Sequence, residues 1–471
     1  MLDLKSAFFA YVLIGLLLLA GRFVRQKLQI LRSLYLPSSV VAGVLALLLG
    51  PQVLGAIAPD SAPGAMGAFS EPVIEVWRQS PGVFINVVFA ALFLGETLPN
   101  PRDIWQKAAP QIAFGQSLAW GQYVIGSLVA MTILVPVFGM SPISAALIEI
   151  AFEGGHGTAA GMSGTLAELG FPDGADLAVG LATVGIVAGI VTGTLLAQWG
   201  RSKGYITKTV EAGVEPQVGH QSPADRALEA ARARLNRDLL VDPLSLNIGF
   251  VGAAIALGWL ILQGLAGIEA LTWGRTGFVL IPYVPLFPMT LIGGILVQIL
   301  LVRLGIDALI DRRLMERIAG VALDVVVVSA LATISLQVLG SNFAAFLILA
   351  IVGIIWNVAA FLWLAPRILP TYWFERGIGD LGQSMGVTAT GILLLRMVDP
   401  DNRSGAFESF AYKQLFFEPI VGGGLFTAAA PIMIHELGVV SVLALSAVLL
   451  AFWLGFGLWN YKRVARSRPV S

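Results

Sequence analysis

The chain has 471 residues, of which 57% are hydrophobic and only 12% are charged. Because soluble globular domains carry about 25% charged residues, this composition excludes a soluble protein. The 29 basic and 29 acidic residues balance, so no basic surface for nucleic acid is expected. The absence of cysteine excludes disulfides and thiolate metal sites, and three histidines leave little for a histidine-based metal centre. We therefore predict an all-α polytopic membrane protein.

Eleven apolar segments are candidate membrane spans. They lie near residues 7–21, 36–56, 82–98, 110–138, 175–199, 243–265, 279–302, 318–339, 343–366, 413–434 and 439–459. The first has no small-residue cleavage pattern, so it is expected to be an uncleaved anchor rather than a signal peptide. If the N-terminus is outside, all lysines and arginines except Lys5, Arg78 and Arg275 fall in cytoplasmic segments. The positive-inside rule therefore predicts an N-terminus outside and a C-terminus inside.

Residues 201–242 are much richer in charge than the segments around them. Within them, Ser222 followed by Pro223 is typical of a helix start, and apolar residues then recur at helical spacing. We expect a cytoplasmic linker with one amphipathic helix. It divides the chain into residues 1–200 and 243–438, and residues 439–471 add one transmembrane helix and a basic tail.

Two matches relate the sequences on either side of this linker. Gly82–Val88 resembles Gly320–Val326, and Pro37–Gly43 resembles Pro288–Gly294. Because five predicted spans precede the linker, the second half starts from the opposite side of the membrane. This predicts two inverted repeats of about five transmembrane helices, an architecture found in many secondary transporters.

One segment in each half is too polar and too broken to cross the membrane, namely 143–169 and 377–397. In the first, two apolar flanks are separated by Gly154–Gly157. Irregular backbone at membrane depth is tolerated only where it lines a protein cavity or a water-filled site, so both segments are predicted to be re-entrant hairpins. Entering from opposite faces, their tips would form one shared site for Na⁺ and an anionic group.

The strings Glu153–Ala160 and Gly386–Gly391 resemble the bacterial glutamate:sodium symporter family, over roughly residues 7–435. The resemblance implies inverted five-span repeats with a re-entrant loop each and a homodimer in the bacterial cytoplasmic membrane. It also implies Na⁺-driven uptake of glutamate and an elevator-like movement. Carried over by motif, the family's first-hairpin residues fall on Gly154, Gly155, His156, Gly157 and Thr158.

Four polar residues are the predicted sodium ligands: Asn86, Glu153, Asp324 and Asp380. Asp324 lies in mid-span, where an ionisable side chain costs about 2.5–3.5 kcal/mol, so a functional role is the default. Asp324 could bind Na⁺, carry protons or form a structural hydrogen bond. Asn86 is the neutral residue at the equivalent position of the first repeat. Glu153 and Asp380 border the hairpin tips, where fixing the tip through backbone N–H groups is the alternative role.

The predicted substrate-binding residues are glycines and polar positions of the two hairpins. They are Gly155, His156, Gly157, Thr158, Gln383, Ser384, Gly386, Thr388, Thr390 and Arg396. His156 could instead stabilise its tip or carry protons. The guanidinium fork of Arg396 suits a substrate carboxylate, and extension to the membrane interface is its alternative.

These features predict a secondary transporter for sodium-coupled uptake of L-glutamate or a related acidic amino acid, with no cofactor besides the coupling ion. A proton- or sodium-coupled carrier of another organic anion is the alternative. No Walker sequence is present, so an ion gradient is the expected drive. An enzyme is not expected, because His435-Glu436 lacks the second histidine of a zinc-protease motif at Val439. A channel would need a continuous polar lining, whereas the polar residues cluster at the two hairpins.

Overall fold

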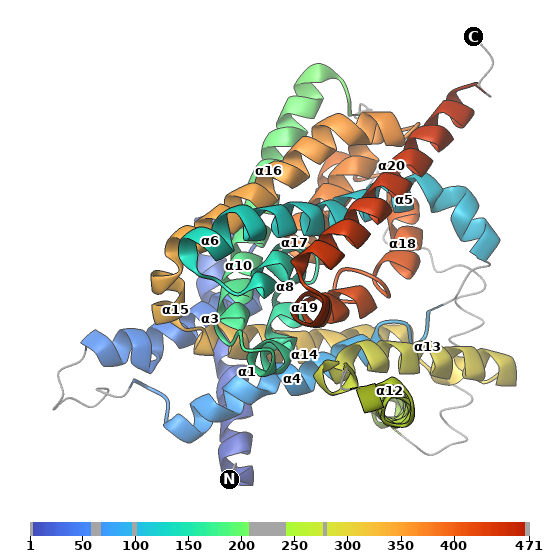
Figure 1. The fold of residues 1–471 in the computed structure, drawn as a ribbon. Helices are drawn as coiled ribbons and strands as arrows, with labels where there is room; N and C mark the ends of the chain where they lie inside the picture. Colours follow the sequence, from blue (N-terminus) through green and yellow to red (C-terminus); the bar gives the residue numbers. More distant parts are fainter. Residues whose placement is uncertain (1–2, 58–66, 97–100, 207–241, 277–279, 467–471) are drawn as a thin grey trace. The chain divides into compact units, whose positions relative to one another are not determined.

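The computed structural model describes residues 3–57, 67–96, 101–206, 242–276 and 280–466. Within these ranges the secondary structure is helical and contains no β-strand (Figure 1). Nine helices of the described residues are long and apolar enough to cross a membrane. They are Leu4–Lys27, Ser38–Gly55, Ala108–Phe138, Asp173–Lys203, Pro243–Leu271, Leu286–Leu304, Phe343–Ile368, Trp373–Val398 and Val439–Arg463. The prediction of an all-α membrane protein is thereby confirmed. The amphipathic helix expected in the linker lies outside the described residues.

The first half of the chain forms a series of helices of very different lengths. The elements are α1 (Leu4–Lys27), α2 (Gln29–Ser33), α3 (Ser38–Leu49), η1 (Pro51–Gly55), α4 (Glu71–Ala91), α5 (Pro101–Val129), η2 (Ala130–Leu134), α6 (Val135–Phe138), η3 (Pro142–Ala146), α7 (Leu147–Phe152), α8 (Gly155–Gly161), α9 (Ser163–Glu168) and α10 (Asp173–Lys203). The short helices from η3 to α9 occupy the segment predicted as the first hairpin.

The second half also combines long helices with short ones. The elements are α12 (Pro243–Leu271), η4 (Trp273–Thr276), η5 (Ile281–Tyr283), α13 (Leu286–Leu304), η6 (Asp307–Leu309), α14 (Arg312–Thr333), α15 (Leu336–Ser341), α16 (Phe343–Ile368), α17 (Trp373–Val398), α18 (Ala406–Phe417), α19 (Leu425–Leu437) and α20 (Val439–Arg466).

Three of the eleven predicted spans differ in the structure. The predicted spans at 82–98 and 318–339 correspond to α4 and α14, which begin earlier and do not belong to the nine apolar helices. The single span predicted over 413–434 is wrong, because α18 ends at Phe417 and α19 begins at Leu425. Between them Gly422 and Gly423 have φ angles of 71° and 101°, in the left-handed region that interrupts an α-helix.

The chain forms two compact units, and each combines segments from both halves of the sequence. The first unit consists of residues 1–82, 100–207 and 325–471, and the second consists of 83–99 and 208–324. In the first unit α10 packs against α17, and α5 packs against α16, α18 and α20 (Figure 1).

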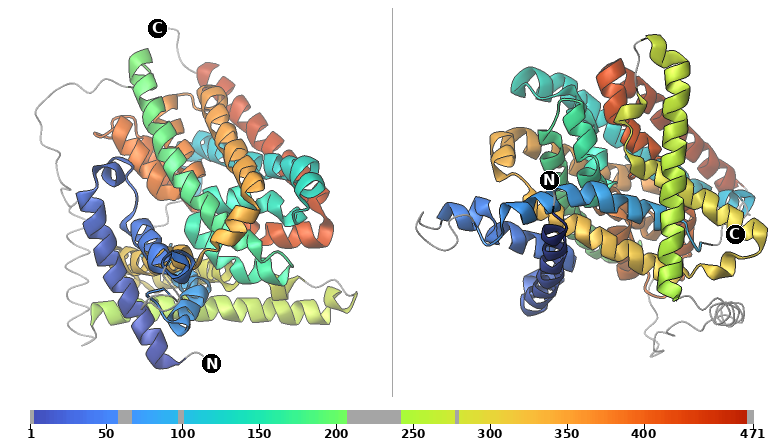
Figure 2. Two further views of the ribbon diagram at one scale, coloured as in Figure 1. Left: turned by 90° about the vertical axis from the view of Figure 1, so that its left-hand side faces the viewer. Right: turned by 90° about the horizontal axis from the view of Figure 1, so that it is seen from below.

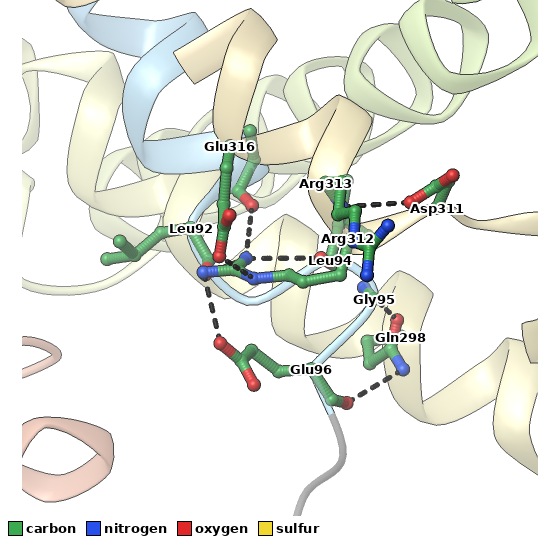
Figure 3. Close-up of polar contacts among 10 residues, drawn as sticks. Leu92, Leu94, Gly95, Glu96, Gln298, Asp311, Arg312, Arg313 and Glu316 are labelled. Atoms are coloured by element: carbon green, nitrogen blue, oxygen red, sulfur yellow. Dashed lines mark hydrogen bonds and ion pairs between the residues drawn. The ribbon is translucent and has the colours of Figure 1, made fainter. Parts of the chain in front are cut away.

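The second unit is built on the pair α12 and α13, which pack along each other (Figure 2). Gly293 allows the closest approach, since a Cβ atom there would lie 2.1 Å from the carbonyl oxygen of Ala254. In the same unit the turn after α4 is held by Arg312, which donates to the carbonyl of Leu92 at 2.8 Å and pairs with Glu96 at 3.0 Å (Figure 3). This unit therefore contains a tightly fixed polar turn.

Candidate functional site

The segment predicted as the second hairpin folds back on itself. In α17 the helix is interrupted at Gly386 and Val387, with φ and ψ of −150° and 39° and of 60° and 176°. A Cβ atom on Gly391 would lie 2.5 Å from the carbonyl oxygen of Gly379, and one on Gly382 would lie 2.9 Å from Cα of Gly391. Residues 379 and 391 would be about 18 Å apart in a straight α-helix, at 1.5 Å per residue. The 26 residues of α17 are therefore a helical hairpin with two arms and a tip at Gly386–Val387, and α17 is not a single straight span although its total length and apolar composition would suffice for one.

The first predicted hairpin also breaks at its glycines and contacts the tip of the second. Helix α7 ends at Phe152, α8 begins at Gly155, and the φ of Gly155 is +67°. A Cβ atom on Gly155 would lie 2.3 Å from Cγ1 of Val387. Glycine is therefore needed at this position both for its backbone conformation and for the close approach of the two tips.

Helix α10 supports the second hairpin through a line of glycines. A Cβ atom on Gly185 would lie 2.1 Å from the carbonyl oxygen of Met385, and one on Gly193 would lie 2.4 Å from Cδ1 of Leu394. These glycines, four residues apart on one face of α10, therefore form a close helix-packing surface.

Two buried amides hold the first arm of α17 at its tip. Gln122 and Asn357 donate to the carbonyl of Ser384 at 2.8 and 3.0 Å. The Gln122 amide also donates to Oδ1 of Asn357 at 3.2 Å. These bonds satisfy a carbonyl that the helix interruption leaves without its usual partner.

A buried ion pair lies below this tip. The Nζ atom of Lys413 on α18 is 2.9 Å from Oδ1 of Asp380, and their side chains are 1% and 0% exposed. Lys413 also donates to Oε1 of Gln383, and Gln111 on α5 donates to Oδ2 of Asp380 at 2.7 Å. Burial of such a pair is costly unless further hydrogen bonds satisfy the charges, and both charges here have them.

Two glutamates four residues apart in the first hairpin have opposite environments. Glu149 is fully buried and accepts hydrogen bonds from Tyr123 at 2.5 Å, Gly422 at 2.8 Å and Thr427 at 2.9 Å. Glu153 is 2% exposed, and neither of its buried carboxylate oxygens makes a well-aligned hydrogen bond within the described residues; Ser384 and the ammonium group of Lys413 are the groups that stabilise its charge. Glu149 therefore ties helices together, whereas Glu153 retains free acceptor capacity.

Other predicted site residues near the tips make ordinary structural bonds. His156 is buried and shares a hydrogen bond of 2.9 Å with Thr183, which fits the tip-stabilising role. Thr388 donates to Glu418 at 2.9 Å, and Thr390 donates to the carbonyl of Gly386 at 2.6 Å. Gly157 and Thr158 are buried within α8.

The three remaining predicted residues have different surroundings. Arg396 is exposed near the end of the second arm of α17, which favours the interface role. Asn86 and Asp324 belong to the second unit, where both are half-buried. In that unit the Asn86 amide donates to the carbonyl of Val83 at 3.1 Å.

Sequence reasoning missed Lys413, Glu149, Gln111 and Tyr123. Lys413 was assigned to a cytoplasmic loop by the charge count, but its side chain is 1% exposed. A usable signal was present for Glu149, because an acidic residue within an apolar flank requires hydrogen-bond donors or a cation. All four residues lie within apolar helices, where each polar group needs a specific partner.

A polar cavity of about 530 Å³ lies within the first unit, beside the first hairpin. Its lining includes Ser163 on α9, Asp176 on α10, and Gln52, Arg78 and Thr333. Small-molecule pockets are commonly about 300–1,000 Å³, so the volume suits a ligand of amino-acid size with its water.

No protein-family model and no curated protein matches this chain. Among the described residues, no group of three or more histidine, aspartate or glutamate side chains is placed to hold a metal ion.

Proposed function

We propose that the chain is a secondary transporter that couples Na⁺ to the uptake of L-glutamate or a related acidic amino acid across a bacterial cytoplasmic membrane. The observation that carries the proposal is the contact of two glycine-containing hairpin tips beside buried charges, with Gly155 against Val387 and Glu153 close by in the sequence. Interrupted helices at membrane depth are characteristic of the binding sites of secondary transporters.

In this proposal the two hairpins are re-entrant, belong to inverted repeats and enter from opposite faces. The N-terminus is outside and the C-terminus inside, as the distribution of lysine and arginine predicts. The resemblance to the glutamate:sodium symporters adds a homodimer and an elevator-like movement to the proposal.

Glu153 is the best-supported sodium ligand in this site. Buried charges in proteins are paired or coordinate metals, and Glu153 has no direct ion pair among the described residues and at most the Ser384 hydroxyl as a donor. Backbone carbonyls exposed at the interrupted helix ends would complete the oxygen coordination of Na⁺. The N-terminus of the second arm of α17, after the interruption at Gly386 and Val387, favours a substrate carboxylate.

The test is uptake of radiolabelled L-glutamate into proteoliposomes under an inward Na⁺ gradient, with choline as the control cation. We expect accumulation above equilibrium with Na⁺ only. Glu153→Gln is expected to lose this Na⁺ activation without unfolding, since glutamine has nearly the size of glutamate and keeps one oxygen that can accept from Ser384. Glu168→Gln, an exposed change in the same hairpin, is the matched control and should transport normally.

Folded protein that accumulates no glutamate would reject that substrate. Uptake of another organic anion, or uptake driven by a proton gradient, would then identify the alternative carrier. Retention of full Na⁺ activation by Glu153→Gln would remove Glu153 from the sodium site.

A further inference from the structure

The ammonium group of Lys413 occupies a site with the features of a monovalent-cation site. Its Nζ atom lies 2.9 Å from Oδ1 of Asp380 and is bonded to the amide oxygen of Gln383. It also lies over two aromatic rings, 4.2 Å from the centroid of Phe417 and 4.9 Å from that of Phe410. A cation within about 6 Å of a ring centroid is attracted by the negative face of the ring.

This set of groups favours a single positive charge. One carboxylate, one amide oxygen and two ring faces present negative potential, and the carboxylate of Asp380 brings one formal charge. The second oxygen of Asp380 accepts from Gln111 at 2.7 Å, so the carboxylate is held in place without the cation. A divalent ion would be left undercompensated in this buried place, whereas a monovalent cation is neutralised.

The neighbouring helix α5 leaves room for the lysine. A Cβ atom on Gly115 would lie 2.8 Å from Cδ and 3.1 Å from Nζ of Lys413. The side chain therefore reaches from α18 along a glycine of α5 to the first arm of α17. The ammonium links three helices, and it reaches Asp380 from outside the hairpin that carries this residue.

We propose that Asp380, Gln383 and the rings of Phe410 and Phe417 form a monovalent-cation site that the chain fills with the ammonium group of Lys413. The consequence for transport depends on the proposed function: Asp380 does not bind Na⁺, and sodium coupling is left to Glu153 and the other predicted ligands. Removal of the ammonium group opens the site to a free monovalent cation.

Cation-dependent stability tests the proposal without any measurement of transport. Purified Lys413→Ala is heated in sodium, potassium, n-propylammonium or choline chloride at constant ionic strength, beside the unchanged protein. The variant should be less stable in choline and regain stability in Na⁺ or n-propylammonium, whose three-carbon chain and amine replace the atoms that the substitution removes. A cation that binds only the folded state lowers the unfolding equilibrium constant about 11-fold at ten times its dissociation constant.

Two further variants make the result specific. Lys413→Ala combined with Asp380→Asn retains the space but loses the anion, so cations should no longer stabilise it. If Lys413→Ala cannot be purified, Lys413→Gln takes its place in the experiment. This variant keeps an N–H donor for Asp380 and leaves room for an ion, so the same dependence of its stability on the cation is expected.

The proposal is overturned if neither single variant is stabilised by Na⁺, K⁺ or n-propylammonium over choline. It is also overturned if the double variant responds as strongly as Lys413→Ala. A failure of glutamate uptake would leave both results unchanged, so the proposed transport function and the cation site fail independently.

Discussion

Replacement of Gly155 by alanine tests the contact between the two hairpin tips. The new Cβ atom would lie 2.3 Å from Cγ1 of Val387. Carbon atoms are in favourable contact at about 3.5–4.0 Å, so the tips must separate by about 1.2–1.7 Å or a side chain must rotate. Overpacking of this kind costs about 1–3 kcal/mol. The φ of +67° adds about 1–2 kcal/mol for a residue with a Cβ atom.

A matched glycine separates these two costs. Gly139 has a φ of +65°, and a Cβ atom there would meet no atom within 4 Å. Gly139→Ala should therefore lose only the conformational part, about 1–2 kcal/mol. Gly155→Ala should lose about 2–5 kcal/mol, the sum of both parts. The assay is unfolding of each purified variant in detergent micelles.

A double-mutant cycle with Val387→Ala then measures the contact itself. Without Cγ1, the nearest atom to the new Cβ would be Cβ of residue 387 at 3.7 Å, an ordinary contact distance. Gly155→Ala should then cost no more than Gly139→Ala, and the coupling energy should equal the overpacking of about 1–3 kcal/mol. Equal losses for the two single glycine variants, or a coupling near zero, would refute the contact between the tips.

Three more changes have definite expected outcomes. Gly185→Ala should destabilise the protein and impair uptake far more than Gly189→Ala. The new Cβ atom would lie 2.1 Å from the Met385 carbonyl oxygen in the first variant, but 3.2 Å from the Met385 Cβ in the second. Equal unfolding midpoints of the two variants would contradict this. Glu149→Gln should lower the free energy of unfolding by about 1–3 kcal/mol. The neutral amide weakens the three hydrogen bonds to this side chain and places an NH₂ group against at least one of the donors. Denaturant titration measures the loss. Asp324→Asn should weaken the Na⁺ activation of uptake more than it changes the unfolding midpoint, and an unchanged Na⁺ activation curve would exclude Asp324 from coupling.

The features predicted successfully depend on local sequence signals. Long apolar runs give the helices, and glycines within short apolar flanks give the interruptions at Gly155 and Gly386. The glycine stripe of α10 likewise predicts its close packing, because residues four apart share one helix face.

The features that were missed depend on partners far apart in the sequence. Lys413 reads as a loop charge because the positive-inside rule counts lysines without knowing what they contact. Its partner Asp380 is 33 residues away. Likewise, the free acceptors of Glu153 and the three donors to Glu149 follow from packing of separate helices, and the residues of the first hairpin alone do not distinguish the two carboxylates.

Two unfavourable features occur at the facing hairpins. Val387 has φ and ψ of 60° and 176°, a conformation that costs a residue with a side chain about 1–3 kcal/mol. Glu153 keeps a buried carboxylate without a direct ion pair among the described residues. Neither feature improves folding, and both persist because the surrounding helices fix the tips. A cation bound at Glu153 would compensate the buried charge, so binding and the closed arrangement of the tips should stabilise each other, which is the linkage that an ion-coupled carrier requires.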